Sequence, residues 1–187
     1  LMRETLWHTQ GDFREYERTL REHLAACQET SNPRIIAIAK GELGAFLIRQ
    51  GKFAEGFSAL DESVTALDQI GAIAEYYFYS LFLSDAQIQL GQFDQAYTRS
   101  QEAMPFLRKY SQFPLVGYNL IILGWAALAM KKYAEARQYL EEIEIVEPEI
   151  RVLDRAHGPA ALILAERGLG RPARAINHLR KALRIGI

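Results

Sequence analysis

The sequence predicts an all-α protein in which antiparallel helix hairpins stack side by side into a curved solenoid. A turn-like stretch of a glycine, a variable residue and an aromatic residue recurs along the chain. It begins at positions 11, 51 and 91, with weaker forms at positions 131 and 170. The step between successive copies is about 40 residues, and a fixed period of this length marks a repeat protein. Between the turns, apolar residues recur at steps of three and four, which is the spacing of a helix.

No segment shows the sustained alternation of apolar and polar residues that is typical of a strand. Tyr76-Tyr77-Phe78-Tyr79 has the composition of a strand, but it falls one period after Ile36–Ala39, inside an expected helix. The repeat period therefore overrides this local preference. We expect a single array over residues 1–187, with repeats at about 1–30 (partial), 33–70, 74–110, 114–147 and 152–187.

The repeat at residues 33–70 carries the clearest signals for two helices. Pro33 suits the first turn of a helix, and Ser31 or Asn32 can cap it. Gly51 can adopt the left-handed conformation that ends this helix. A second helix then follows, with an apolar stripe formed by Phe53, Phe57, Leu60, Val64 and Leu67.

Glycines inside these two helices predict a close contact between their backbones. Gly44 and Gly56 each cost about 1 kcal/mol relative to alanine at a helical position, and close packing can offset that cost. Gly124 and Ala136 occupy the same places two periods later, and Leu140 falls where Leu60 fell.

The other repeats follow the same order of helix, turn and helix. The expected helices cover residues 74–90 and 93–107, then 115–130 and 133–146, then 152–169 and a last helix that opens at Pro172; the first repeat keeps only the end of its first helix. Pro105 is expected to kink or end its helix, because proline lacks the backbone N–H. The connections near residues 70–74, 110–114 and 147–151 are expected to be longer than the glycine turns.

Composition excludes several classes of protein. Hydrophobic residues make up 49% of the 187 residues, as in folded chains, and the net charge of −1 gives no long-range field for nucleic acid or membranes. The single cysteine, Cys27, permits no internal disulfide and fits a reducing compartment. Residues 1–9 show no signal peptide, and the most apolar run, 115–130, is shorter than a membrane span. We expect a cytoplasmic fragment of a larger regulatory protein, without a membrane partner.

No set of residues predicts catalysis or cofactor binding. The four histidines lack the ligand spacing of metal sites, apart from His8 with Asp12, and that pair spans a predicted turn. The chain has no glycine-rich phosphate loop and no nucleophile elbow. The carboxylates between Glu141 and Glu149 are typical of a solvated helix face. We therefore expect a protein that is not an enzyme and has no metal or cofactor.

The repeats resemble the tetratricopeptide family over nearly the whole chain. The match rests on Leu43-Gly44, Leu47, Gly51-Lys52-Phe53, Gly56 and Leu60, recurs in Leu123-Gly124, Tyr133, Ala136 and Leu140, and is weaker in Gly91-Gln92-Phe93, Ala96 and Ala103. The commonest period of that family is about 34 residues, so the helices or loops of this chain are expected to be longer. The resemblance implies a right-handed superhelix whose first helices line a concave face.

Repeats of this length look like the sensor arrays of bacterial multidomain transcriptional regulators. They also look like peptide-pheromone receptors and the cargo-binding arrays of motor light chains. This likeness implies non-catalytic binding of a protein or peptide, as a scaffold or in signalling and transcription regulation. A second hypothesis is a small-ligand-sensing domain of a multidomain transcriptional regulator.

The repeat period predicts which side chains line the concave groove. The candidate binding residues are Phe78, Leu81, Asp85, Ile88, Tyr118, Ile121, Trp125, Leu128 and His157. The same period places Leu164 and Arg167 on the lining. The Lys and Asn residues of the family's carboxylate clamps are absent from these positions, so the expected partner is an apolar helix or an extended peptide. The alternative is that Phe78, Tyr118 and Trp125 pack against the neighbouring repeat.

The C-terminal segment is strongly basic. From Arg151 to Ile187, eight arginines and lysines stand against two acidic residues, a net charge of +6. A phosphate-binding surface is one interpretation, but no aromatic residue is interleaved with the cations. The favoured interpretation is a solvated or partner-facing end formed by Arg171, Arg174, Arg180, Lys181 and Arg184. Nucleic acid is therefore not an expected partner, and self-association through the array ends stays open.

Overall fold

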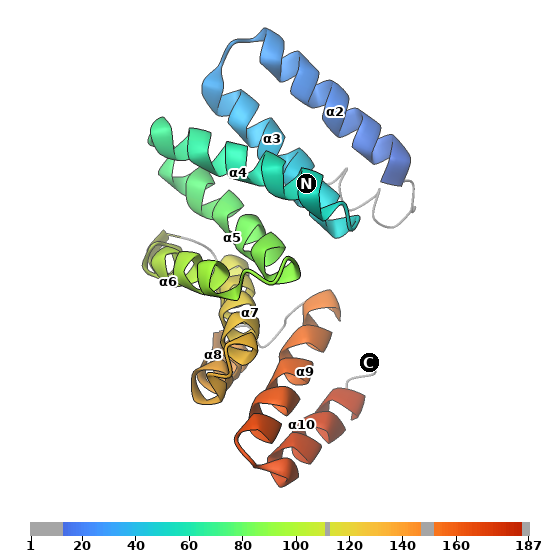
Figure 1. Cartoon of the computed structure of the whole chain (residues 1–187), viewed down its shortest axis with the longest axis vertical. Coiled ribbons are helices and arrows are strands. Elements are labelled where there is room, and N and C mark those ends of the chain that lie inside the picture. The colour runs from blue at the N-terminus through green and yellow to red at the C-terminus, as the bar shows by residue number, and fades with distance from the viewer. Residues whose placement is uncertain (1–12, 111–112, 147–151, 185–187) are drawn as a thin grey trace. The chain divides into compact units, whose positions relative to one another are not determined.

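The structure, a computed structural model, describes residues 13–110, 113–146 and 152–184, and the side chains of 13–110, 115–143 and 160–180. Every regular element in these ranges is an α-helix (Figure 1), so the predicted all-α fold of sequential hairpins is confirmed. The helices are α2 (Phe13–Glu29), α3 (Pro33–Arg49), α4 (Phe53–Gln69), α5 (Ile73–Gln89), α6 (Phe93–Tyr110), α7 (Phe113–Ala129), α8 (Tyr133–Val146), α9 (Val152–Gly168) and α10 (Pro172–Arg184).

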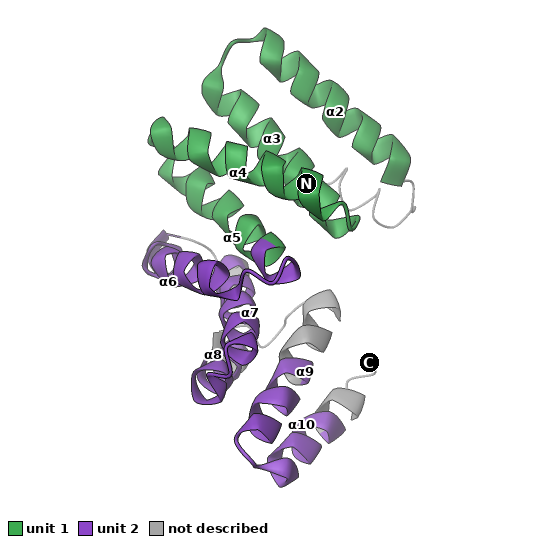
Figure 2. Cartoon of the chain, viewed as in Figure 1, with its two compact units in different colours: residues 1–86 green, residues 87–187 purple. Residues whose placement is uncertain are grey.

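The chain divides into two compact units, residues 1–86 and 87–187 (Figure 2). In the first unit α3 packs against both α2 and α4, and α5 shares a core with α4. In the second unit each helix from α6 to α10 packs against the next one, and α7 also contacts α9. Packing is thus mainly between helices that follow each other in sequence, as in other repeat proteins.

A 17-residue helix followed by a three-residue turn generates the repeat period. α3, α4 and α5 each have 17 residues, and three residues separate each from the next. One helix with its turn therefore spans half of the period, and a hairpin with both turns spans all of it. Longer helices, not longer loops, make this period greater than the commonest one of the tetratricopeptide family.

The expectation of longer connections between hairpins is wrong where the structure describes both ends. Residues 70–72 connect α4 to α5, as short as the glycine turn at 50–52, and α7 begins three residues after α6 ends. The connection near 147–151 lies outside the described residues. Pro105 was expected to kink or end its helix, and an end is wrong, since α6 continues through this proline to Tyr110.

Left-handed residues end the helices at equivalent places. Gly51, Gly71 and Gly91 have φ angles of 75°, 67° and 77°, and Lys131 adopts the same conformation with φ 60°. At the first of these turns the Lys52 N–H donates to the Leu47 carbonyl at 3.0 Å, which satisfies one of the last carbonyls of α3. The role predicted for Gly51 is confirmed, whereas Gly71, half a period further on, is not among the predicted glycine turns.

Glycine permits α3 and α4 to approach with their backbones almost in contact. A Cβ placed on Gly44 would lie 2.9 Å from both the Gly56 carbonyl oxygen and the Leu60 nitrogen. In the second unit, a Cβ on Gly124 would lie 2.6 Å from a side-chain carbon of Leu140. The close packing predicted at Gly44 and Gly124 is therefore confirmed.

Candidate functional site

The candidate functional site is a pocket in the second unit, with a volume of about 640 Å³. This volume falls within the range of ligand-binding pockets. Helices α5 to α9 all contribute to the lining, which consists of Ile88, Phe93, Trp125, Leu128, Ala129, Tyr133, Leu164, Arg167 and Gly168.

The repeat places equivalent residues around this pocket. Ile88 and Leu128 lie one repeat period apart, and each is close to the end of the first helix of its hairpin. Phe93 and Tyr133 are separated by the same period, and each is the first residue of the second helix. The pocket therefore lies where two successive hairpins make their glycine-type turns, and at these equivalent positions each of the two hairpins supplies one aliphatic and one aromatic side chain.

α7 supplies the largest part of the lining. Trp125, Leu128 and Ala129 are spaced by three and four residues, so they share one face of the helix. Ala126 and Ala127, between them, are fully buried in the core of the unit. One face of α7 thus packs in the interior while the adjacent face leaves the half-buried Trp125 and Leu128 at the pocket.

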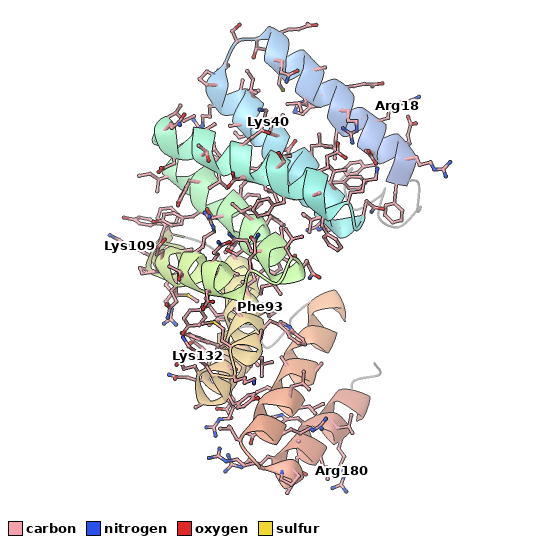
Figure 3. All side chains as sticks on the ribbon, in the orientation of Figure 1. Arg18, Lys40, Phe93, Lys109, Lys132 and Arg180 are labelled. Atoms are coloured by element: carbon pink, nitrogen blue, oxygen red, sulfur yellow. The ribbon has the colours of Figure 1, made fainter. Side chains whose placement is uncertain are left out.

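A glycine at the end of α9 positions one of the aromatic walls. A Cβ on Gly168 would overlap the ring of Tyr133, so only glycine lets this ring lie directly against the α9 backbone. The equivalent aromatic residue Phe93 stands at the start of α6 (Figure 3). Together with Trp125, these rings bring three aromatic side chains from three helices to one pocket.

One charged residue lines this otherwise apolar site. Arg167 is exposed, and its side chain has no ion-pair partner among the described residues. Leu164, one helical turn earlier, remains 42% exposed. The pocket therefore offers a wide apolar contact surface with a single positive charge.

The structure brings together three of the nine predicted groove residues. Ile88, Trp125 and Leu128 line the pocket, and so do Leu164 and Arg167, which the repeat period also placed on the lining. These five residues come from α5, α7 and α9, which are the first helices of three successive hairpins. The lining also includes Phe93 and Tyr133 from second helices, and a binding role for the predicted residues stays a prediction.

Other predicted groove residues lie elsewhere. Leu81 is fully buried and Ile121 is 6% exposed, so both are core residues with almost no surface for a partner. Asp85 and Tyr118 are half-buried and are not part of the pocket lining. The side chain of His157, on α9, lies outside the described residues.

Phe78 belongs to an aromatic cluster of the first unit. Its ring is 37% exposed and packs edge-on against Tyr79 and Phe82, with ring centroids 5.1 and 5.2 Å away. Both partner rings belong to α5 itself, so the assignment of Phe78 to the groove or to packing against the neighbouring repeat stays a prediction.

Sequence reasoning did not select Phe93, Tyr133, Ala129 or Gly168 as site residues. The recurrence of Phe93 and Tyr133 one period apart, directly after a turn, is the signal that could have found these two, because Ile88 and Leu128 share this period. No local signal marks Gly168, since its role depends on a ring of another helix.

Among the residues whose side chains the structure describes, the ionisable group with the largest pKa shift lies outside the pocket. Burial raises the pKa of Tyr97, as do its hydrogen bonds with Glu135 and Tyr139. This phenol therefore stays protonated and joins α6 to α8. The described residues contain no group of three or more potential metal ligands, and none of their helices is long and apolar enough to cross a membrane.

Solved structures resemble the chain along almost its entire length, although no family model and no curated protein matches its sequence. BtubC (BKLC) from P. vanneervenii superposes with a TM-score of 0.79 and 19% identity, covering 97% of this chain and 76% of that one. A putative kinesin light chain of Podosopora anserina with nearly identical TPR-like repeats superposes with a TM-score of 0.76 and 17% identity, covering 97% of this chain and 90% of that one. MamA from Desulfovibrio magneticus RS-1 superposes with a TM-score of 0.67 and 14% identity, covering 96% of this chain and 89% of that one.

The chain has a tetratricopeptide-like repeat fold. At identities of 19% or below, the likeness concerns the fold and leaves the partner undefined. It supports the broad resemblance stated above, but it gives no support to the narrower likeness to arrays of transcriptional regulators. The pocket itself therefore carries the evidence for function.

Proposed function

We propose that this chain is a non-catalytic binding module whose pocket in the second unit receives apolar side chains of a protein or peptide partner. The observation that carries the proposal is the convergence of Phe93, Trp125 and Tyr133 on one open, mostly apolar site. Aromatic residues in pockets are among the commonest energetic anchors of protein interfaces. Proteins with tetratricopeptide-like repeats typically act as protein-binding scaffolds, which agrees with this proposal.

Partial exposure is the second reason to expect binding. Leu164 leaves 42% of its surface in water, and Trp125 and Leu128 are only half-buried. A partner that covers these side chains removes apolar surface from water at about 25 cal/mol per Å². The free energy of binding is therefore favoured by burial of apolar surface that remains exposed after this unit has folded.

Selection of peptides from a random display library on the 187-residue chain, followed by fluorescence anisotropy, tests the proposal. Leu164→Ser should weaken the binding of the selected peptides about fivefold or more, because part of an apolar contact is lost. Its thermal unfolding should barely change, since the leucine is already 42% exposed. The matched control is Ile73→Ser in the first unit, where the replaced side chain is 56% exposed and lies outside the pocket.

Equal binding by wild type and Leu164→Ser would contradict the proposal, as would an equal loss in Leu164→Ser and Ile73→Ser. A second candidate function, a small-ligand sensor, is favoured by the pocket volume of about 640 Å³. A small-molecule library screened by thermal shift separates the two functions, because a ligand that binds only the folded form stabilises it. Stabilisation of the wild type but not of Leu164→Ser, with no peptide selected, would establish the sensor instead.

A further inference from the structure

We infer that the contact between Gly168 and Tyr133 selects the side chain that enters the pocket, and that this side chain is aromatic. The inference rests on the proposed function, because selectivity requires that the pocket binds a peptide. It adds the chemical class of the anchoring side chain and the residue that determines it. Gly168 acts through the ring of Tyr133 and is therefore a positioning residue.

Gly168 departs from the repeat at the place where it borders the pocket. The last residues of the first helices in four successive hairpins are Arg49, Gln89, Ala129 and Gly168. The backbone does not require glycine here, because Gly170 is the residue of this turn with a positive φ angle, at 68°. Glycine also destabilises a helix relative to alanine. Neither backbone conformation nor helix propensity therefore accounts for the glycine at position 168.

The neighbouring ring of Tyr133 does account for it. A Cβ placed on Gly168 would lie 2.4 Å from Cδ1 of this ring and 2.5 Å from both Cε1 and Cγ. Carbon atoms that are not bonded to each other normally approach to about 3.5–4.0 Å, so any residue with a Cβ would displace the ring. An aromatic ring is rigid and has to move as a whole.

The surrounding packing determines where a displaced ring can go. One helical turn from Tyr133 and from Gly168, respectively, Ala136 and Ala165 are fully buried in the core of the unit. Such a close-packed core has no room for a ring. The pocket that Tyr133 lines is the open space beside it. A Cβ at position 168 should therefore move the ring toward the pocket and make the pocket smaller.

With the ring held against α9, the pocket has room for a large side chain. Its volume is about 640 Å³, and Phe93, Trp125 and Tyr133 bring rings from three helices to its wall. Aromatic rings attract one another in offset or edge-to-face arrangements, in addition to the effect of buried area. An aliphatic side chain gains from buried area alone. The pocket should therefore prefer an aromatic anchor in the partner.

Parallel selections on two forms of the complete chain test the inference. The same random peptide display library is selected on the wild type and on Gly168→Ala, and an alanine scan of each peptide identifies its anchor. We expect an aromatic anchor on the wild type and a smaller aliphatic anchor on Gly168→Ala. The matched control is Gln89→Ala, which places alanine at the equivalent end of α5, outside the pocket lining, and should retain the wild-type preference.

Fluorescence anisotropy then measures the preference directly. The aromatic-anchored peptide should bind Gly168→Ala about tenfold more weakly than it binds the wild type, because the displaced ring occupies part of its site. The same peptide with valine at the anchor should bind the two proteins within about twofold of each other. A general loss of binding would weaken both peptides equally.

Removal of the ring separates this mechanism from a weakened helix end. In a Tyr133→Ala background, Gly168→Ala should change the affinity of the aromatic-anchored peptide by less than about twofold, because no ring remains to be displaced. An effect of alanine on the end of α9 itself would persist in this background. The pair of backgrounds therefore keeps the test valid if Gly168→Ala alone is less stable than the wild type.

Two results would overturn the inference. The first is equal binding of the aromatic and valine peptides to the wild type. The second is a Gly168→Ala protein that keeps the wild-type preference, or that loses binding equally with and without the Tyr133 ring. Leu164→Ser reports separately on the proposed function: if it weakens the selected peptides while Gly168→Ala leaves their preference unchanged, the pocket binds peptides but Gly168 does not select them. If the library yields no peptide at all, both proposals fail.

Discussion

Gly44 and Gly124 occupy equivalent positions in two repeats, yet they face different obstacles. The backbone of α4 blocks a side chain at Gly44, whereas the side chain of Leu140 blocks one at Gly124. A leucine side chain can rotate or shift slightly, but a packed backbone moves only if the whole helix moves. The same substitution should therefore have unequal effects at the two positions.

We expect Gly44→Ala to lower the free energy of unfolding by about 1–3 kcal/mol, the range of overpacked cores. Gly124→Ala should lower the free energy of unfolding by a smaller amount, because the Leu140 side chain can move aside and alanine improves helix propensity by about 1 kcal/mol. Urea unfolding of both variants and the wild type measures the difference. A Gly44→Ala protein as stable as the wild type would show that the two backbones are not in close contact.

At the scale of the helices, a residue in the left-handed conformation controls the turn after a helix. Glycine occupies this position at residues 51, 71, 91 and 170, but serine occupies it at 31 and lysine at 131. A side chain in this conformation carries a steric cost that glycine avoids. The turns at Ser31 and Lys131 should therefore be less favourable than the glycine turns.

Opposite substitutions in equivalent turns should have opposite effects. Lys131→Gly is expected to raise the free energy of unfolding by up to about 1 kcal/mol, and Gly91→Ala to lower it by a similar amount. Apart from its chain neighbours, no atom lies within 4 Å of a Cβ placed on Gly91, so backbone strain alone causes the predicted loss. Chemical unfolding measures both changes, and a shift of the same sign in both variants would exclude this explanation.

Across the whole molecule, the features predicted correctly are those encoded locally. Helical spacing and the turn at Gly51 lie within single segments, so the repeat period could be predicted from the chain alone. The length of the connection after α4 was missed, because Gly71 is not followed by the aromatic residue that marks the turns at Gly51 and Gly91. A turn is set by its backbone conformation, and this can be present without the expected sequence signature.

The pocket could be predicted only in part, because contacts between helices are not encoded within single segments. The period placed Trp125 and Leu128 on a surface, and both line the pocket. Leu81 and Ile121 were assigned to the same surface but are buried, because neighbouring helices cover them. The contact of Tyr133 with Gly168 joins two helices, and single-segment patterns carry no information about it.

The fluorescence of Trp125 tests the central claim, that the pocket is the peptide-binding site, most directly. The chain has two tryptophans, so a Trp7→Phe variant leaves Trp125 as the reporter. We predict that selected peptides shift its emission to shorter wavelengths in a saturable way, with the same midpoint as the anisotropy titration, because the peptide excludes water from the indole. A peptide that binds this variant with full affinity but leaves the emission of Trp125 unchanged would contradict the claim.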